Sequence, residues 1–156
     1  MEELARGVGE RLKSARAMLV TAESCTGGWV AQALTSVAGS SEWFERGFVA
    51  YSNDAKRELL GVRAETLSRH GAVSEETARE MARGALERSR GTLALAVTGI
   101  AGPGGASPGK PVGMVCFAWA AKAGLLCSET CHFRGDRESV RRQSVIHALE
   151  GVLKNP

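Results

Sequence analysis

The sequence predicts an α/β fold, a three-layer α/β/α sandwich on a mixed, mostly parallel sheet of about five strands with one antiparallel hairpin. Short apolar segments alternate with helical patterns through the first two thirds of the chain, which favours parallel strands joined by helices. Near the C-terminus, two apolar segments are separated by only three residues, which is typical of an antiparallel hairpin. The length of 156 residues predicts a single domain over residues 1–156.

The first helix is predicted over residues 2–15, where Leu4, Val8 and Leu12 form an apolar stripe. A buried strand follows at 17–22, and a helix entered through two glycines at 26–37. Residues 39–41 are then expected to form a connector that includes one helical turn.

A second strand is predicted at 48–52. Asn53 is the expected N-cap of a helix that runs to residue 60, because asparagine side chains accept hydrogen bonds from free helical N–H groups. Ser74 is expected to cap the next helix, which runs to about residue 90 with acidic residues in its first turn.

The C-terminal third is predicted to begin with a buried strand at 92–97 and a long loop of glycine and proline at 99–111. The hairpin strands are expected at 112–121 and 125–133. Asp136 is the expected cap of a final helix that reaches residue 153.

The composition excludes several classes of protein. Hydrophobic residues make up 44% and charged residues 24%, which excludes a disordered, collagen-like or coiled-coil chain. A net charge of +3 and an aromatic content of 5% argue against a nucleic-acid partner. No apolar run approaches the ~20 residues that span a bilayer, and the acidic, amphipathic N-terminus does not resemble a signal peptide. The four cysteines do not suggest a disulfide framework, so we expect a reduced, cytoplasmic protein without a membrane partner.

Three polar segments follow the predicted parallel strands directly, at 23–28, 52–56 and 98–105. Ligands of open α/β sheets bind in the crevice beyond the carboxyl ends of the strands. Ser24 lies there beside the free N–H groups of a helix start, which suit an oxyanion or a phosphate. Lys56 lies in the first turn of its helix, where dipole and desolvation would lower its pKa and make it a general base. The alternatives are that Ser24 or Thr26 is only a cap and that Lys56 is solvated.

Other candidates are weaker. Cys25, with Glu23 and Lys56 beside it, is a second possible amide-hydrolysing nucleophile. The G-x-x-x-x-G-K match at 104–110 is not a phosphate-binding loop, because a proline and a strand follow it. The glycine-rich start of the same loop, at 99–105, is more consistent with backbone contact to a ligand.

No metal site is predicted. The Cys127-x-x-x-Cys131-His132 segment has poor ligand spacing for a strand, where successive side chains face opposite sides. Neither His70 nor His147 has a visible acidic or nucleophilic partner, so both are interpreted as structural. The arginines that open the last helix suggest an anionic ligand or an ion-pair network; they are Arg137, Arg141 and Arg142.

Seven segments of the chain, taken in order, resemble one family, the CinA C-terminal-domain family of nicotinamide mononucleotide deamidases. They are Thr21-Ala22-Glu23-Ser24-Cys25-Thr26-Gly27-Gly28, Ala38-Gly39-Ser40-Ser41, Tyr51-Ser52-Asn53 with Lys56, Gly71-Ala72-Val73-Ser74, Thr98-Gly99-Ile100-Ala101-Gly102-Pro103, Lys110-Pro111-Val112-Gly113 and Gly135-Asp136-Arg137. The resemblance extends over nearly the whole chain. It implies the three-layer fold, a homo-oligomer (dimer or higher), and hydrolysis of the nicotinamide carboxamide to nicotinate mononucleotide and ammonia, in pyridine-nucleotide salvage.

The resemblance also implies a serine–lysine pair without metal or cofactor. Lys56 would be the base, and Ser24 and Ser41 are both candidate nucleophiles. The expected substrate-binding residues are Thr26, Gly27, Gly28, Tyr51, Asn53, Thr98, Gly99, Gly102, Arg137 and Arg142, with Arg137 assigned to the phosphate. Two alternative functions are a non-catalytic nucleotide-binding or competence-related interaction protein and a Cys25-dependent amidase.

Overall fold

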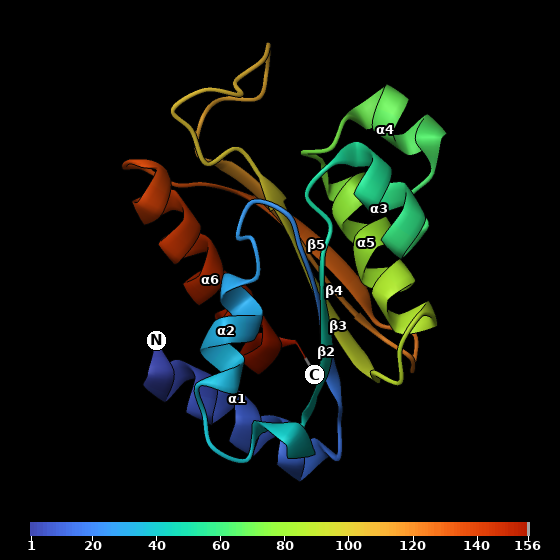
Figure 1. Cartoon of the computed structure of the whole chain (residues 1–156), viewed down its shortest axis with the longest axis vertical. Helices are drawn as coiled ribbons and strands as arrows, with labels where there is room; N and C mark the ends of the chain where they lie inside the picture. The colour runs from blue at the N-terminus through green and yellow to red at the C-terminus, as the bar shows by residue number, and fades with distance from the viewer. Residues whose placement is uncertain (156) are drawn as a thin grey trace.

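The computed structural model describes residues 1–155 and contains a five-stranded sheet covered by helices on both faces (Figure 1). The strands lie in the spatial order β2-β1-β3-β4-β5. β1 pairs in parallel with β2 and β3, whereas β4 is antiparallel to both of its neighbours, so four strands share one direction. This confirms the predicted mixed sheet and its hairpin. The strands are β1 (Leu19–Glu23), β2 (Phe44–Val49), β3 (Leu93–Gly99), β4 (Met114–Ala121) and β5 (Leu126–His132).

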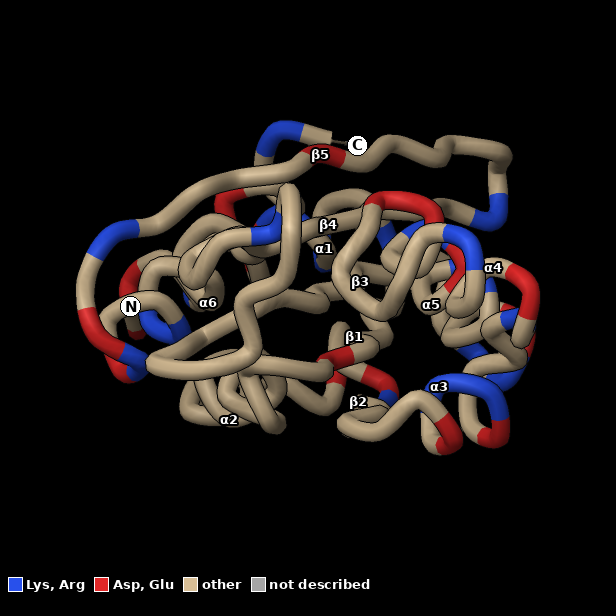
Figure 2. The backbone as a smooth tube through the Cα atoms, turned by 90° about the horizontal axis from the view of Figure 1, so that it is seen from above, with Lys and Arg blue, Asp and Glu red and all other residues tan. Residues whose placement is uncertain are grey.

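The helices form the two outer layers, which Figure 2 shows on either side of the strands. One layer holds α1 (Glu2–Ala15), α2 (Trp29–Thr35) and α6 (Arg137–Lys154). The other holds α3 (Asn53–Leu60), α4 (Ala64–His70) and α5 (Glu75–Glu87). Within residues 1–155, no helix combines the length and the apolar character needed to cross a bilayer.

Alternation along the central strands divides the core between the two faces. Leu95 and Val97 of β3 pack against the α1, α2 and α6 layer, while Ala94 and Ala96 pack against α5. The small alanine side chains let α5 lie close to the sheet. Gly84 lets α5 lie close to α3, because a Cβ at this position would lie 1.8 Å from the carbonyl oxygen of Leu60 in α3.

The structure corrects the predicted boundaries of several elements. β2 begins at Phe44, four residues earlier than predicted, because this edge strand is largely exposed and Glu45 and Arg46 interrupt its apolar pattern. β1 is shifted by one to two residues, and α2 is limited to Trp29–Thr35. The prediction missed α4, whose last residue is His70.

Two of the three predicted helix caps are confirmed. The side chains of Ser74 and Asp136 accept hydrogen bonds from Thr77 N and Ser139 N at the starts of α5 and α6. The Asn53 cap is wrong, because Ser52 accepts the hydrogen bond from Ala55 N and Asn53 is already helical.

Candidate active site

A cavity of about 280 Å³ lies beyond the carboxyl ends of β1 and β3, as the sheet topology predicts. Five segments far apart in the sequence form its walls: the β1–α2 loop, the start of α3, the turn before α5, the loop after β3 and the first residue of α6. The lining residues are Ser24, Cys25, Tyr51, Asn53, Lys56, Ala72, Val73, Thr98, Gly99, Ile100, Ala101, Gly102, Gly104, Gly105 and Arg137.

A serine and a lysine make direct contact on one wall of this cavity. The Lys56 Nζ lies 2.9 Å from the Ser24 Oγ. The same nitrogen donates hydrogen bonds to the carbonyl oxygens of Ala50, at 3.2 Å, and Tyr51, at 3.0 Å. Only 1% of Lys56 and 7% of Ser24 is exposed. The two residues of the predicted serine–lysine pair, Ser24 and Lys56, are therefore in direct contact at this edge of the sheet.

The surroundings of Lys56 favour its neutral form. Burial lowers the pKa of the Lys56 ammonium, and no ion pair among residues 1–155 includes it. A neutral amine has two N–H groups and one lone pair. The two carbonyl oxygens accept the N–H groups, which leaves the lone pair to accept the Ser24 hydroxyl proton.

The β1–α2 loop that carries Ser24 is held by a buried carboxylate. Glu23 is 1% exposed and accepts hydrogen bonds from the N–H groups of Gly28, Val30 and Ala31, at 2.9–3.1 Å. The start of α2 is therefore not free to bind an anion, which corrects the expectation that its first N–H groups meet the substrate. Gly27 and Gly28 instead allow the chain to turn, because their φ values of 60° and 101° lie in the left-handed region that favours glycine.

Two other N–H groups beside Ser24 are available. Within residues 1–155, the backbone N–H groups of Cys25 and Thr26 donate no hydrogen bond to another residue. The carbonyls of the same two residues are fixed by the Arg141 guanidinium, which donates to both at 3.0 Å. Arg141 also stacks over Trp29, 5.4 Å from the ring centroid. The loop is thus immobilised with free donors next to the serine.

The opposite wall and the rim carry further predicted residues. Arg137 donates hydrogen bonds to the Gly102 carbonyl, at 2.8 Å, and to the Tyr51 hydroxyl, at 3.2 Å. The Thr98 hydroxyl donates to the Ala72 carbonyl at 2.8 Å, so this side chain fixes the cavity wall. Tyr51 is 60% exposed at the rim.

The structure does not bring every predicted residue into the cavity. Ser41 lies in the short 3-10 helix η1 (Ser40–Glu42), which precedes β2, whereas Lys56 follows it. The six residues of β2 separate the two ends by roughly 20 Å. Arg142 is exposed on α6 and does not line the cavity, and neither do Thr26, Gly27 and Gly28 of the β1–α2 loop.

Sequence reasoning named Arg141 and Glu23 but gave them other roles, although the sequence contains a signal for the supporting role of one of them. Arg141 follows Arg137 by four residues and therefore shares its helix face, whereas Arg142 does not. For Glu23, nothing in the local pattern shows that its carboxylate caps α2.

The histidine prediction also needs correction. His70 Nδ1 lies 3.9 Å from a Glu76 carboxylate oxygen, and His147 contacts both Glu129 and Cys131. Strand alternation places Cys131 and His132 on opposite faces of β5. The histidine that contacts Cys131 is instead His147, which α6 supplies.

Known proteins resemble the chain over almost its whole length. A family model described as the CinA C-terminal domain matches residues 1–155. The chain is 54% identical over 148 residues to "Nicotinamide-nucleotide amidohydrolase PncC" of Escherichia coli K12, which covers 95% of this chain and 90% of that protein. It is 51% identical over 151 residues to the protein of the same name from Pseudomonas putida, covering 97% and 94%. The crystal structure of competence/damage inducible protein CihA from Agrobacterium tumefaciens superposes with a TM-score of 0.95 at 51% identity, covering 98% of this chain and 93% of that one.

Proposed function

Because this chain belongs to the CinA C-terminal domain family, and its relatives are named nicotinamide-nucleotide amidohydrolases, we propose that it hydrolyses the carboxamide of nicotinamide mononucleotide to nicotinate mononucleotide and ammonia. The observation that carries this proposal is the 2.9 Å contact between the Lys56 Nζ and the Ser24 Oγ, two buried groups on the wall of the cavity. An amide hydrolase needs a base, a nucleophile and oxyanion donors, and this cavity contains all three.

In the proposed first step, the neutral Lys56 amine takes the Ser24 hydroxyl proton as the serine oxygen attacks the carboxamide carbon. The N–H group of Cys25, which lines the cavity, stabilises the negative charge on the carboxamide oxygen. The lysine ammonium then returns its proton to the amide nitrogen, and ammonia leaves. Water, deprotonated by the same amine, hydrolyses the acyl-enzyme.

Ser24 is favoured over the other candidate nucleophiles by its surroundings. Ser41 lies at the opposite end of β2 from the base. Burial raises the pKa of the Cys25 thiol to about 12, so a reactive thiolate is scarce at neutral pH. These observations support the serine–lysine mechanism over a Cys25-dependent amidase.

We propose that Arg137 binds the phosphate of the substrate. Its guanidinium lies at the rim of the cavity, and no ion pair among residues 1–155 neutralises it. It contacts only neutral oxygens within the chain, which a doubly charged phosphate would displace readily.

The test is a coupled ammonia assay on the purified chain with nicotinamide mononucleotide. We expect ammonia and nicotinate mononucleotide in equal amounts, with unchanged turnover in EDTA because the mechanism uses only protein groups. A chain that binds the nucleotide without releasing ammonia would instead be a binding protein. Activity that is lost in EDTA and restored by zinc, in a chain that stays folded throughout, would contradict the serine–lysine mechanism.

A further inference from the structure

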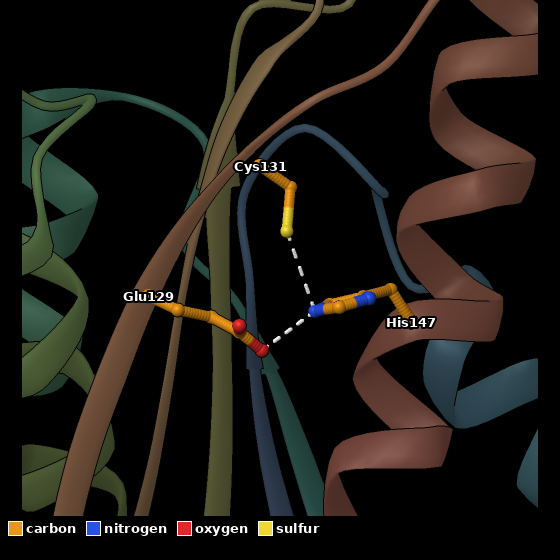
Figure 3. A group of neighbouring side chains, drawn as sticks. All are labelled: Glu129, Cys131 and His147. Atoms are coloured by element: carbon orange, nitrogen blue, oxygen red, sulfur yellow. Dashed lines mark hydrogen bonds and ion pairs between the residues drawn. The ribbon is translucent and has the colours of Figure 1, made fainter.

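Three side chains outside the active-site cavity converge on one point between the sheet and α6 (Figure 3). Glu129 and Cys131 extend from β5, and His147 extends from α6. The His147 Nε2 lies 2.6 Å from a Glu129 carboxylate oxygen and 3.4 Å from the Cys131 Sγ. All three ligand atoms lie within 4.8 Å of one another.

The fold holds these groups in place. Glu129 and Cys131 are two residues apart in a strand, so they share the face that looks toward α6. The His147 ring packs against Phe117, with ring centroids 4.7 Å apart, and its centroid lies 6.0 Å from that of Phe133. This aromatic packing leaves the Nε2 directed at β5, as Figure 3 shows.

A single proton on Nε2 serves the carboxylate well but leaves the thiol without a strong partner. Glu129 and Cys131 both contact the same ring nitrogen rather than one nitrogen each. If Nε2 carries a hydrogen, it donates to the carboxylate and has no lone pair for the thiol. If it is bare, its lone pair faces the carboxylate oxygens. A cation between the three atoms would be favourable to all of them.

We propose that Glu129, Cys131 and His147 bind a divalent transition-metal ion of the Zn²⁺ class, with water as the fourth ligand. Tetrahedral zinc bonds of about 2.0–2.3 Å place ligand atoms roughly 3.3–3.6 Å apart. The Sγ–Nε2 distance of 3.4 Å already fits this spacing. The Glu129 side chain is exposed and can move outward to reach it.

The chemistry of the ligands selects the metal. Thiolate and imidazole are ligands of zinc and its neighbours, whereas Mg²⁺ and Ca²⁺ bind oxygen atoms. None of the three residues lines the active-site cavity. The ion would therefore fasten the edge strand β5 to α6 rather than take part in the reaction, and the proposal does not depend on the proposed function.

The test measures Zn²⁺ and Co²⁺ binding to the full chain after treatment with chelator. We expect about one Zn²⁺ per chain, a higher melting temperature with Zn²⁺, and no such effect of Mg²⁺. Co²⁺ should give a thiolate-to-cobalt charge-transfer band. Cys131→Ser should abolish this band, and His147→Gln should weaken binding by more than the ~10–100-fold that loss of an outer-shell partner costs.

Two controls keep the result decisive. Cys127 lies on the same face of β5, four residues from Cys131, but outside the cluster, so Cys127→Ser should keep the charge-transfer band. Glu129→Gln changes an exposed side chain, so the protein should fold while its zinc affinity falls. The proposal is wrong if the unaltered chain binds neither metal ion, if Cys131→Ser and Glu129→Gln bind zinc normally, or if Cys127→Ser removes the band equally.

Discussion

Lys56 is a buried amine whose nearest polar neighbours are a hydroxyl and two carbonyl oxygens. Such an environment stabilises the neutral base that the proposed reaction needs and disfavours the ammonium form. The same burial costs stability, because below its folded-state pKa the amine must be charged away from water.

Lys56→Met should remove the base while filling its buried volume. We expect kcat to fall by at least ~10²–10⁴-fold, the range of general acid–base catalysis. In the parent enzyme, kcat/KM should rise with pH as Lys56 deprotonates, with a midpoint below the ordinary value of 10.5. An active Lys56→Met variant would contradict the mechanism.

The same variant also tests the direction of the Lys56 pKa. The unfolded chain binds the Lys56 proton up to pH 10.5, while the folded chain releases it at lower pH. Stability rises with pH wherever the unfolded state holds more protons. The parent should therefore gain stability relative to Lys56→Met as pH increases from the folded-state pKa towards 10.5. Denaturant unfolding at several pH values measures this difference.

Ser24→Ala and Ser41→Ala identify the nucleophile. Ser24→Ala should abolish both turnover and the burst of acyl-enzyme formation, because Ser24 Oγ contacts the base. Ser41→Ala is the matched control at the other end of β2 and should keep normal kinetics. The reverse result would require Ser41 to reach the cavity from a second subunit. Cys25→Ala should keep most of the activity, since its thiol is protonated at neutral pH.

At the scale of elements, loops and the first turns of helices pack together to form the site. α2 is seven residues long, and a single carboxylate from the preceding strand satisfies two of its N–H groups and that of its N-cap, Gly28. α6 supplies Arg137 to the rim and, one turn later, Arg141 to the loop beneath. The two helices thereby fix the position of Ser24 from both sides.

Glu23→Gln should weaken the start of α2, because the amide NH₂ cannot accept a hydrogen bond and would face N–H donors. Leaving a buried donor unsatisfied costs about 1–3 kcal/mol, so we expect a loss of this size in denaturant unfolding, with reduced turnover. Glu138→Gln makes the same change in the exposed first turn of α6. Its effect should stay within ~0.5 kcal/mol. Equal effects of the two changes would show that Glu23 does not hold the loop.

Arg137→Ala should raise KM for the mononucleotide more than it lowers kcat. A charge-assisted hydrogen bond contributes about 1.5–3 kcal/mol, which corresponds to roughly ten- to a hundredfold in affinity. Use of nicotinamide riboside, which lacks the phosphate, should hardly change. Arg142→Ala is the control, since this arginine is exposed and outside the cavity. Equal losses on both substrates would indicate a structural role for Arg137 through its Gly102 and Tyr51 contacts.

At the scale of the whole molecule, the sheet has two edge strands, β2 and β5, each paired on one side only within the described chain. The homo-oligomer implied by the family resemblance remains a prediction. Size-exclusion chromatography with light scattering should give a mass of at least twice 16.5 kDa. A monomer at assay concentrations that is fully active would contradict it and would also exclude a site shared between subunits.

The sequence by itself determined the fold class and the neighbourhood of the site. Alternating apolar segments predicted the mixed sheet. Because parallel strands bring their carboxyl ends to one edge, the sequence alone placed Ser24 and Lys56 at the same crevice. The predicted element boundaries were less accurate where the apolar pattern or the capping signal is weak. β2 is an exposed edge strand, and α4 is a single short helix without a side-chain cap.

Only the tertiary structure decided which side chains meet. The hydrogen bonds by which Arg141 holds the β1–α2 loop and Glu23 caps α2 depend on how separate elements pack, which local patterns do not encode. The meeting of Cys131 with His147 is another example, because it joins a strand to a helix sixteen residues away. Periodicity is a property of one segment, whereas a contact depends on the relative placement of two, and that placement is set by the core that both segments share.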